Sequence, residues 1–394
     1  MTLSVRQQQE GKSETHRIQA NVGSSIITLP SQGTQRPHLD EVDRDFVRAL
    51  EQVMKAVAKA PGKRHSVDLT RFLYSKKIPT GYTRSGSECA EHLFSGISDP
   101  LYTIPRAEVR LLDINSKVIS SFFSTHFPNT DVTHVSLGCG PYTSVFSKDL
   151  LMARLLQAKY YTAIDINKQQ AQSAVTNIGS RVHGIIPDYI AQDFTKPIHF
   201  KNIPQDNLVV MTMLGDTIAQ YTCAKDSLSK KKDKTSALER LLVNFGESTN
   251  YSAVLFATLD EETDPNSAIQ KYQGVGMKRL METFWGTAKE VTGDVNFTPC
   301  AFEYRPEFDE ETSSVLFVHE ARKDTSLTIK GKTYPIPKNT EIVIGCSQKT
   351  SAEQIIPICK KAGWVPANIQ FSYDSTARAV MLLGKNLRLQ APAS

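Results

Sequence analysis

Strand-like and helical segments alternate through the middle of the chain, and this alternation limits the possible folds more than any other feature of the sequence. Apolar, strand-like segments lie at residues 132–137, 160–166, 184–192, 207–214 and 251–259. Segments with apolar residues at helical spacing lie between them, at 146–157, 168–178 and 238–245. This order is typical of an α/β fold with a doubly wound parallel sheet, in which helices cover both faces.

Other stretches depart from this pattern. Residues 363–374 and 378–384 predict an antiparallel pair that closes one edge of the sheet. Residues 260–318 interrupt the alternation with a long helix and a hairpin-like run, which predicts part of a separate lid domain. Before residue 62 the sequence is polar, and its one expected helix, at 39–60, has apolar residues on a single face.

The composition limits the class of protein. The chain has 394 residues, 40% hydrophobic and 22% charged, and a net charge of +5, which is mild for this length. The sequence has no apolar run long enough to span a membrane and no secretory signal at its start. Its six cysteines are scattered, which argues against a zinc site and against a disulfide framework. We therefore expect a cytoplasmic protein without a metal site or a membrane partner.

A glycine turn follows the first strand of the alternation. Gly138 and Gly140, in VSLGCGPYTS, come directly before a helical segment, and in an open α/β sheet this turn lies close to the ligand. Glycine allows a tight turn and the close approach of a ligand. A dinucleotide fingerprint would need a third glycine, but Thr143 stands there, and Pro141 removes an amide donor. The alternative interpretation is a tight loop without a ligand.

Acidic residues mark the ends of the next two strands. Asp165 ends the second strand, where a carboxylate can bind ribose hydroxyls, although it could also cap the following helix. Asp193 and Phe194 follow the third strand and suit an adenine, although a loop cap with a core phenylalanine is the alternative. Together with the glycine turn, these residues predict a nucleoside site without a pyrophosphate cradle, as S-adenosylmethionine (SAM) requires.

Several motifs occur in the order of a known family. They are GYTRSGSECAEHLFSGISDPLYTIPRAE, LGCGPYTS, IAQDF, MLGDTIAQY and AIQKYQGVGMKRLMETFW. With them the chain, from about Leu69 onward, resembles the SAM-dependent histidine N-methyltransferases of ergothioneine biosynthesis, which include fungal dimethylallyltryptophan N-methyltransferases of secondary metabolism. The resemblance implies a seven-stranded, Rossmann-like class I methyltransferase sheet and a small second α+β substrate or lid domain. The implied domains are an N-terminal extension at 1–61, a substrate domain at 62–105 plus 260–320, and a SAM-binding domain at 106–259 plus 321–394.

The resemblance also implies roles for individual residues. Gly138 and Gly140 would approach the methionine part of SAM, Asp165 its ribose, and Asp193 and Phe194 its adenine. Tyr82 would close over the cofactor. Tyr102 would meet the amine that accepts the methyl group, as the catalytic residue. Gln220 and Tyr272 would hold the carboxylate of the acceptor.

Departures from the family affect the expected acceptor. The residues that grip an imidazole in the histidine methyltransferases align with Leu316 and Val318, which cannot form side-chain hydrogen bonds. Unpaired imidazole nitrogens would lose a few kcal/mol of binding. We therefore expect an N-methyltransferase for a small-molecule amine, an amino acid or derivative with an apolar or aromatic side chain, acting as a monomer or weak homo-oligomer. Gln220 replaces a family asparagine and would reshape the carboxylate pocket.

Four alternatives remain at this point. One is a histidine N-methyltransferase. Another is a nucleic-acid methyltransferase or RNA-binding protein that uses the lysines of SLSKKKDKTS, although GDTIAQ stands where base methyltransferases carry their Pro-Pro-aromatic motif. A third is a SAM-binding protein without catalytic activity. The fourth, an NAD-linked oxidoreductase, conflicts with the missing third glycine.

Overall fold

A computed structural model gives the fold of the chain, and residues 1–40 lie outside the part that it describes. The described residues are 41–67, 69, 101–140, 148–200, 202–215, 217–218, 236–248, 252–367, 369, 371–384 and 387. Residues 38–394 group into one compact unit. No helix among the described residues is both long enough and apolar enough to cross a membrane.

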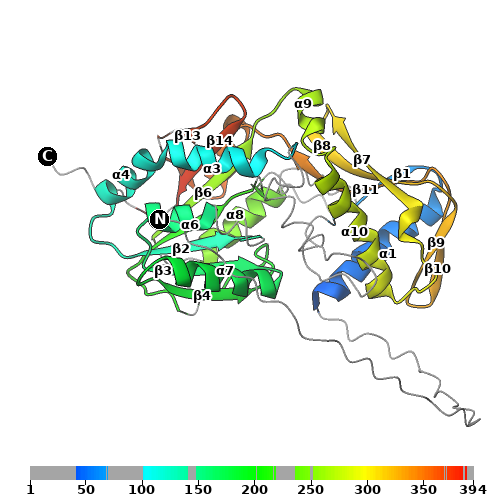
Figure 1. Cartoon of the computed structure of the whole chain (residues 1–394), viewed down its shortest axis with the longest axis horizontal. Helices are drawn as coiled ribbons and strands as arrows, with labels where there is room; N and C mark the ends of the chain where they lie inside the picture. Colours follow the sequence, from blue (N-terminus) through cyan, green and yellow to red (C-terminus); the bar gives the residue numbers. More distant parts are fainter. Residues whose placement is uncertain are drawn as a thin grey trace, which may run out of the picture. The chain divides into compact units, whose positions relative to one another are not determined.

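The larger sheet has eight strands, in the order β12-β14-β6-β5-β2-β3-β4, with β13 also paired to β14. Its parallel strands are β2 (Val132–Leu137), β3 (Tyr160–Asp165), β4 (Ile186–Ala191), β5 (Leu208–Met213) and β6 (Ser252–Asp260). The antiparallel edge consists of β12 (Val365–Pro366), β13 (Phe371–Ser372) and β14 (Ala377–Leu383). The predicted doubly wound α/β fold is confirmed (Figure 1).

The expected strand number was seven, and the difference arises at the antiparallel edge. Residues 363–374 were expected to supply one strand, but they supply the two short strands β12 and β13, both of which pair with β14. Pro366 ends β12 and has no amide hydrogen to donate to a neighbouring strand. The edge segment therefore pairs in two short pieces.

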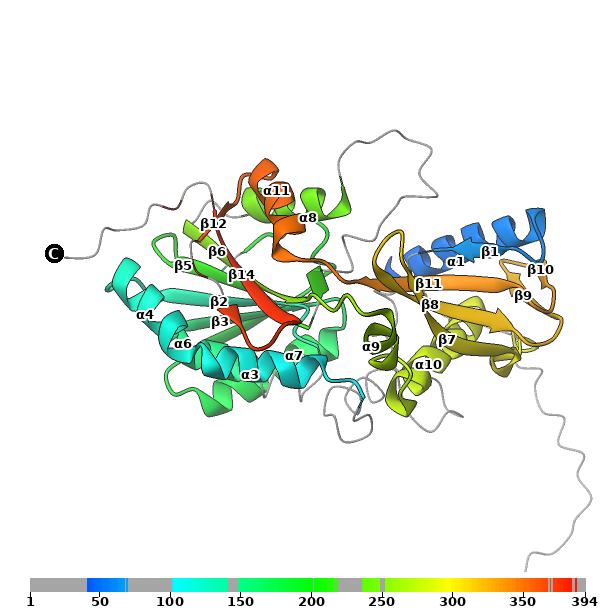
Figure 2. The same ribbon diagram turned by 90° about the horizontal axis from the view of Figure 1, so that it is seen from above.

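Helices cover both faces of the larger sheet (Figure 2). One face packs against α3 (Ile104–Ile114), α4 (Ser116–His126), α6 (Leu150–Leu155) and α7 (Lys168–Arg181). The other face packs against α8 (Ala237–Ser248) and α11 (Ala352–Lys361). Along β5, Leu208 and Val210 join the first core, whereas Val209 and Met211 join the second. Because both faces of the central strands β5 and β6 are buried, these strands form nearly continuous apolar runs.

A second sheet has four strands, in the order β1-β11-β8-β7. These are β1 (Arg64–Ser66), β7 (Phe302–Asp309), β8 (Ser314–Ala321) and β11 (Glu341–Gln348). A separate hairpin consists of β9 (Thr325–Ile329) and β10 (Lys332–Ile336). One hydrophobic core joins both to the helices α1 (Glu41–Lys59) and α10 (Val275–Thr292). The short helices α9 (Pro265–Gln270) and η4 (Pro299–Ala301) flank α10 in sequence.

The grouping of elements differs from the expected domain bounds in two places. The helix α1, expected in a polar extension, buries Phe46, Leu50 and Val53 in the core of the second sheet. The strand β11, expected in the SAM-binding domain, pairs with β8 and β1. The division of the chain into separate domains stays a prediction.

Candidate active site

The glycine turn and the ends of β3 and β4 meet at one edge of the larger sheet. The Gly138 amide donates to the Ile164 carbonyl at 2.8 Å, and the Gln192 amide donates to the Asp165 carbonyl at 3.0 Å. A Cβ atom on Gly138 would lie 3.2 Å from the Phe194 ring. Parallel strands present their carboxyl ends at the same edge. The structure therefore brings together the residues expected at the nucleoside site.

Gly138 and Gly140 have the backbone conformation that favours glycine. Their φ angles are +70° and +68°, in the left-handed region that is costly for other residues. The side-chain carboxylate of Asp165 accepts a hydrogen bond from the Gly140 amide at 3.1 Å. The turn is thus fixed both by its own backbone and by the next strand.

Asp165 is buried and organises the residues around it. One carboxylate oxygen accepts from Gly140, and the other accepts from the Asn167 amide at 2.8 Å. The N-cap of α7 is Asn167 and not Asp165. Burial raises the pKa of Asp165 and outweighs the hydrogen bonds from these two amides, which lower it. The oxygen that binds Gly140 also accepts from the Cys139 thiol at 3.7 Å, so the second lone pair of the oxygen that binds Asn167 is the one left for a ribose hydroxyl.

Asp193 and Phe194 follow β4. One carboxylate oxygen of Asp193 accepts from the Thr195 amide at 3.0 Å and from the Thr195 hydroxyl at 2.7 Å. The Phe194 ring lies 6.5 Å from the Phe245 ring and packs against the α8 side of the core. The loop-cap contact that was the alternative for Asp193 is therefore present, and it occupies one of the two carboxylate oxygens.

A buried carboxylate on the helix after the glycine turn was missed in the sequence. The Tyr161 hydroxyl donates to Asp149 at 2.6 Å. Burial raises the pKa of Asp149 to about 6. The hydrogen bonds from Tyr161 and Ser136 and the charge of Lys148 lower this pKa, but burial outweighs them. Burial raises the pKa of the Cys139 thiol, and the charges of Asp165 and Asp149 raise it further. Asp149 and Asp165 thus influence the same cysteine of the glycine turn.

Glu108 links four segments near the ends of β5 and β6. Its carboxylate accepts from the Gly215 amide at 2.5 Å and from the Thr258 hydroxyl, and it pairs with the Lys148 ammonium at 2.8 Å. Lys148 lies just before α6, at the end of the segment that follows the glycine turn. The Lys148 ammonium pairs with Glu108, which belongs to the first motif of the family resemblance but had no expected role.

Tyr102 and Tyr272 come together, as the resemblance implied. Their ring centroids lie 5.9 Å apart in an edge-on arrangement, and the two side chains are only 5% and 2% exposed. The Phe317 ring lies 5.4 Å from Tyr272, and the Tyr304 hydroxyl donates to the Tyr272 carbonyl at 3.2 Å. The pair is thus enclosed by aromatic side chains of β7 and β8.

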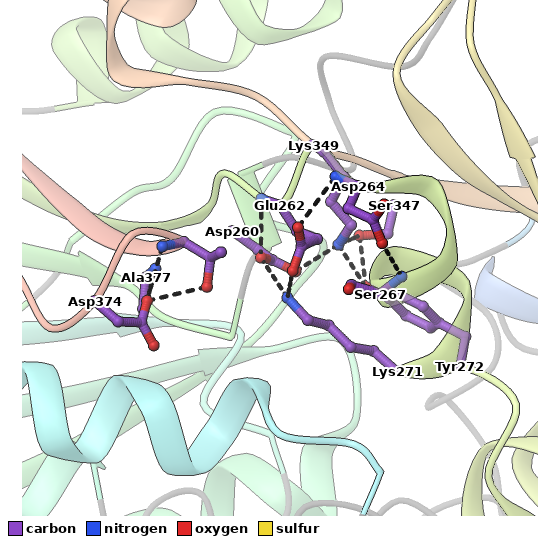
Figure 3. A network of polar contacts seen from close by, with 11 residues as sticks. Asp260, Glu262, Asp264, Ser267, Lys271, Tyr272, Ser347, Lys349, Asp374 and Ala377 are labelled. Atoms are coloured by element: carbon purple, nitrogen blue, oxygen red, sulfur yellow. Dashed lines mark hydrogen bonds and ion pairs between the residues drawn. The ribbon is translucent and has the colours of Figure 1, made fainter.

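A polar network surrounds the Tyr272 hydroxyl (Figure 3). The hydroxyl lies 2.8 Å from Ser347 Oγ and accepts from the Lys349 ammonium at 3.0 Å. Lys349 also donates to Asp260 at 2.7 Å, and Lys271 donates to the other oxygen of Asp260 at 2.8 Å. Burial alone would raise the pKa of Asp260, but the two ammonium groups outweigh it and the pKa is lowered.

A cleft of about 470 Å³ opens next to this network. The N-terminal half of α3, the end of β6, Lys271 and the turn before β14 line it. Arg110 crosses the α3 side and donates to the Tyr373 hydroxyl at 2.6 Å. Neither Tyr102 nor Tyr272 is among the lining residues, so the cleft gives solvent a path to Asp260 and Lys271 rather than to the tyrosine pair.

Leu316 and Val318 do not lie beside Tyr272. Side chains alternate between the faces of a strand, and Val315 and Phe317 of β8 share the core with Tyr272. Val318 is paired with Arg305 and Leu316 with Glu307, on the opposite face. The place of Leu316 and Val318 in the acceptor pocket, which the alignment implied, stays a prediction.

Two further expectations concern residues outside the described part of the chain, and one concerns the cysteines. Tyr82 and Gln220 are not among the described residues. Cys346 is disulfide-bonded, which the scattered cysteine spacing did not indicate, whereas Cys139, Cys300 and Cys359 are free thiols. Within the described ranges, no three histidine, cysteine or acidic side chains are arranged to hold a metal ion.

The family model of the SAM-dependent, histidine-specific methyltransferases matches residues 71–383. The chain belongs to this family. It is therefore a SAM-dependent methyltransferase, and the expected family and cofactor are confirmed. No curated protein matches the chain.

Solved methyltransferase structures are similar only at a low level. The N-methyltransferase NodS from Bradyrhizobium japonicum, in complex with S-adenosyl-L-homocysteine, has 10% identity and a TM-score of 0.33, over 75% of this chain and 98% of that one. Magnesium protoporphyrin IX methyltransferase from Synechocystis has 12% identity and a TM-score of 0.34, over 71% and 85%. The sugar N-methyltransferase KedS8 from Streptoalloteichus has 10% identity and a TM-score of 0.32, over 71% and 87%. These values are too low to add to the family assignment.

Proposed function

We propose that this family member transfers the methyl group of SAM to the amine of a small acceptor, an amino acid or derivative with an apolar or aromatic side chain. The observation that carries the proposal is the enclosed pair of Tyr102 and Tyr272, beside Phe317 and Tyr304. An aromatic enclosure favours an apolar side chain. The Tyr102 hydroxyl gives it a polar position for an amine, and the family resemblance assigns the carboxylate to Tyr272.

The strand-end cluster suits SAM. Gly138 leaves no Cβ between the turn and Phe194, and the Asp165 carboxylate lies in the same cluster with a lone pair of Oδ1 for a ribose hydroxyl. In this proposal Gly138 and Gly140 border the methionine part, Asp165 binds the ribose, and Asp193 and Phe194 bind the adenine. Bound SAM supplies an electrophilic methyl group on a sulfonium.

The protein's own part is to position the amine and to exclude water. A neutral amine needs orientation more than a strong base, because the leaving group of the reaction is already good. We assign that orientation to the Tyr102 hydroxyl, as the catalytic residue, and the carboxylate contact to Tyr272 and Gln220. Enclosure of the tyrosine pair, only 5% and 2% exposed, supports the exclusion of water.

The β8 segment that contains Phe317, the neighbour of Tyr272, disfavours histidine as the acceptor. Leu316, Phe317 and Val318 are all apolar, so neither face of the strand offers an imidazole a side-chain hydrogen bond at this position. His319, further along, already accepts a hydrogen bond from the Trp285 indole at 3.0 Å. An imidazole left without partners costs about 1–3 kcal/mol, roughly a tenfold or larger loss of binding.

The test is a panel of acceptors with labelled SAM, read by mass spectrometry. The panel contains L-tryptophan, L-phenylalanine, L-tyrosine, L-histidine and a mixed RNA. We expect methyl transfer to the amine of an aromatic amino acid, with L-histidine at least about tenfold slower. Transfer chiefly to L-histidine or to RNA, or binding of SAM without transfer to any of them, would overturn the proposal.

A further inference from the structure

We propose that Gln170 is a further cofactor-binding residue, whose side-chain amide pairs with the ribose hydroxyl of SAM that Asp165 cannot bind. This inference rests on the proposed function, which gives the ribose to Asp165. Gln170 belongs to no motif of the family resemblance. Three observations point to it: the hydrogen bonds that Asp165 already accepts, the unpaired amide of Gln170, and the direction in which α7 runs.

The carboxylate of Asp165 has one lone pair left for a ligand. Its Oδ2 accepts from the Cys139 thiol at 3.7 Å and from the Gly140 amide at 3.1 Å, and its Oδ1 accepts from the Asn167 amide at 2.8 Å. A carboxylate offers about four lone pairs, so these contacts leave a single one, on Oδ1. The ribose of SAM carries two neighbouring hydroxyl groups. The second hydroxyl therefore needs another partner at this edge of the sheet.

Gln170 holds an unpaired donor and an unpaired acceptor. Its side chain is 6% exposed, and neither Nε2 nor Oε1 has a hydrogen-bond partner within the described ranges. Buried polar groups are normally paired, because an unpaired one has given up its hydrogen bonds to water for nothing. A hydroxyl group both donates and accepts, so it can pair with either end of this amide. A ribose hydroxyl would thus supply the partner that the protein does not.

The usual partner of a glutamine at this position is already bound elsewhere. Gln170 is in the first turn of α7, three residues after the N-cap Asn167. A glutamine at this position commonly accepts from the backbone amide of the N-cap. Here that amide donates to Asp165, while the Asn167 side chain accepts from the Gln169 and Gln170 amides at 3.0 Å and 3.3 Å. The helix is therefore capped without the Gln170 side chain, which stays available for a ligand.

The buried face of α7 places Gln170 at the carboxyl edge of the larger sheet. Gln170, Ala174 and Ile178 follow one another at four-residue spacing, so they lie on one face of the helix, and all three are buried. Near the other end of this helix, a Cβ atom on Gly179 would lie 3.1 Å from Pro187, which is close to the start of β4. The helix therefore runs antiparallel to the strands, and its first turn lies at the edge that holds the strand-end cluster.

The experiment measures binding to the full chain by calorimetry, with S-adenosylhomocysteine and its 2′-deoxy and 3′-deoxy analogues as ligands. Gln170→Met keeps a similar volume without the amide, and Gln169→Met, at the exposed neighbouring position, is the control. We expect Gln170→Met to weaken S-adenosylhomocysteine binding roughly tenfold, and Gln169→Met to change it less than about twofold. In the wild type, loss of either hydroxyl should weaken binding. In Gln170→Met, loss of one hydroxyl should have no further effect, whereas loss of the other should weaken binding by the wild-type factor.

Each other outcome contradicts a definite claim. Wild-type affinity for S-adenosylhomocysteine in Gln170→Met would overturn the inference. So would a variant that stays as sensitive as the wild type to the loss of each hydroxyl, because the amide would then act without touching the ribose. If Gln170→Met does not fold, Gln170→Leu must show the same lost response to one hydroxyl. A wild type that does not bind S-adenosylhomocysteine, or binds both deoxy analogues equally well, would instead overturn the ribose placement in the proposed function, and this inference with it.

Discussion

The Lys148 ammonium lies 2.8 Å from the Glu108 carboxylate in an ion pair with side-chain exposures of 2% and 5%. The pair joins α3 to the segment between the glycine turn and α6. The Gly215 amide and the Thr258 hydroxyl bind the other oxygen of the same carboxylate. Four segments at the carboxyl edge of the larger sheet therefore depend on one side chain.

Glu108→Gln tests the energetic weight of this pair. The amide oxygen still accepts from Gly215 and Thr258, so the substitution removes mainly the negative charge beside Lys148. Breaking a buried pair from one side costs about 3–5 kcal/mol, and we expect a loss of that order in the free energy of unfolding in urea. The double variant Glu108→Gln, Lys148→Met should recover part of it. A single variant as stable as the wild type would contradict this interpretation.

Gly138→Ala tests the close approach at the glycine turn. The residue has a φ of +70°, and a Cβ would lie 3.2 Å from Phe194. The conformation alone costs about 1–2 kcal/mol, and the contact with Phe194 adds to it. Gly184→Ala is the matched control, because φ is +78° but the Cβ would enter open space. Calorimetry should show weaker SAM binding for Gly138→Ala only. Equal SAM affinity in the two variants would contradict the prediction.

The raised pKa of Asp149 predicts that the stability of the protein depends on pH. Burial raises its pKa to about 6 from 3.8. Between these values the folded protein holds a proton that the unfolded chain has released, so the contribution of Asp149 to stability falls as the pH rises through this window. The total change is on the order of 3 kcal/mol. The difference in unfolding free energy, Asp149→Asn minus wild type, should therefore grow from pH 4 to pH 7. A difference independent of pH would count against it.

The buried side-chain amide of Gln170 predicts that an apolar substitution at this position stabilises the protein. Its side chain is 6% exposed, and both its amide nitrogen and its amide oxygen lack a hydrogen-bond partner within the described part of the chain. An unpaired buried polar group costs about 1–3 kcal/mol. Gln170→Met has a similar volume and should raise the free energy of unfolding by that order. Gln169→Met, at the exposed neighbouring position, should leave it within about 0.5 kcal/mol. A loss of stability in Gln170→Met would show that the amide is paired.

The larger sheet could be predicted because its strands are continuous apolar runs that only a doubly covered sheet can bury. The residues at the ends of β2, β3 and β4 could be predicted for a related reason, since parallel strands place Gly138, Asp165 and Asp193 at one edge. The proximity of Tyr102 and Tyr272 followed from the family resemblance and not from the pattern of residues.

Other features depend on contacts between residues that are far apart in the sequence, which no local pattern indicates. Glu108 and Lys148 are 40 positions apart, and Lys349 and Tyr272 are 77 positions apart. Side chains alternate between the two faces of β8, so Phe317 is the neighbour of Tyr272, while Leu316 and Val318 lie on the opposite face.

The groups that meet around Gly138 come from one continuous stretch, residues 138–194, whereas those around Tyr272 come from Tyr102 before α3, the end of β6, the strands β7 and β8, and the end of β11. Chain exchange can therefore treat the two halves of the reaction as separate modules. A chimera that receives residues 260–349 from a relative would acquire the surroundings of that relative's counterpart of Tyr272, while Tyr102, Gln220 and every group assigned to the methyl donor remained its own.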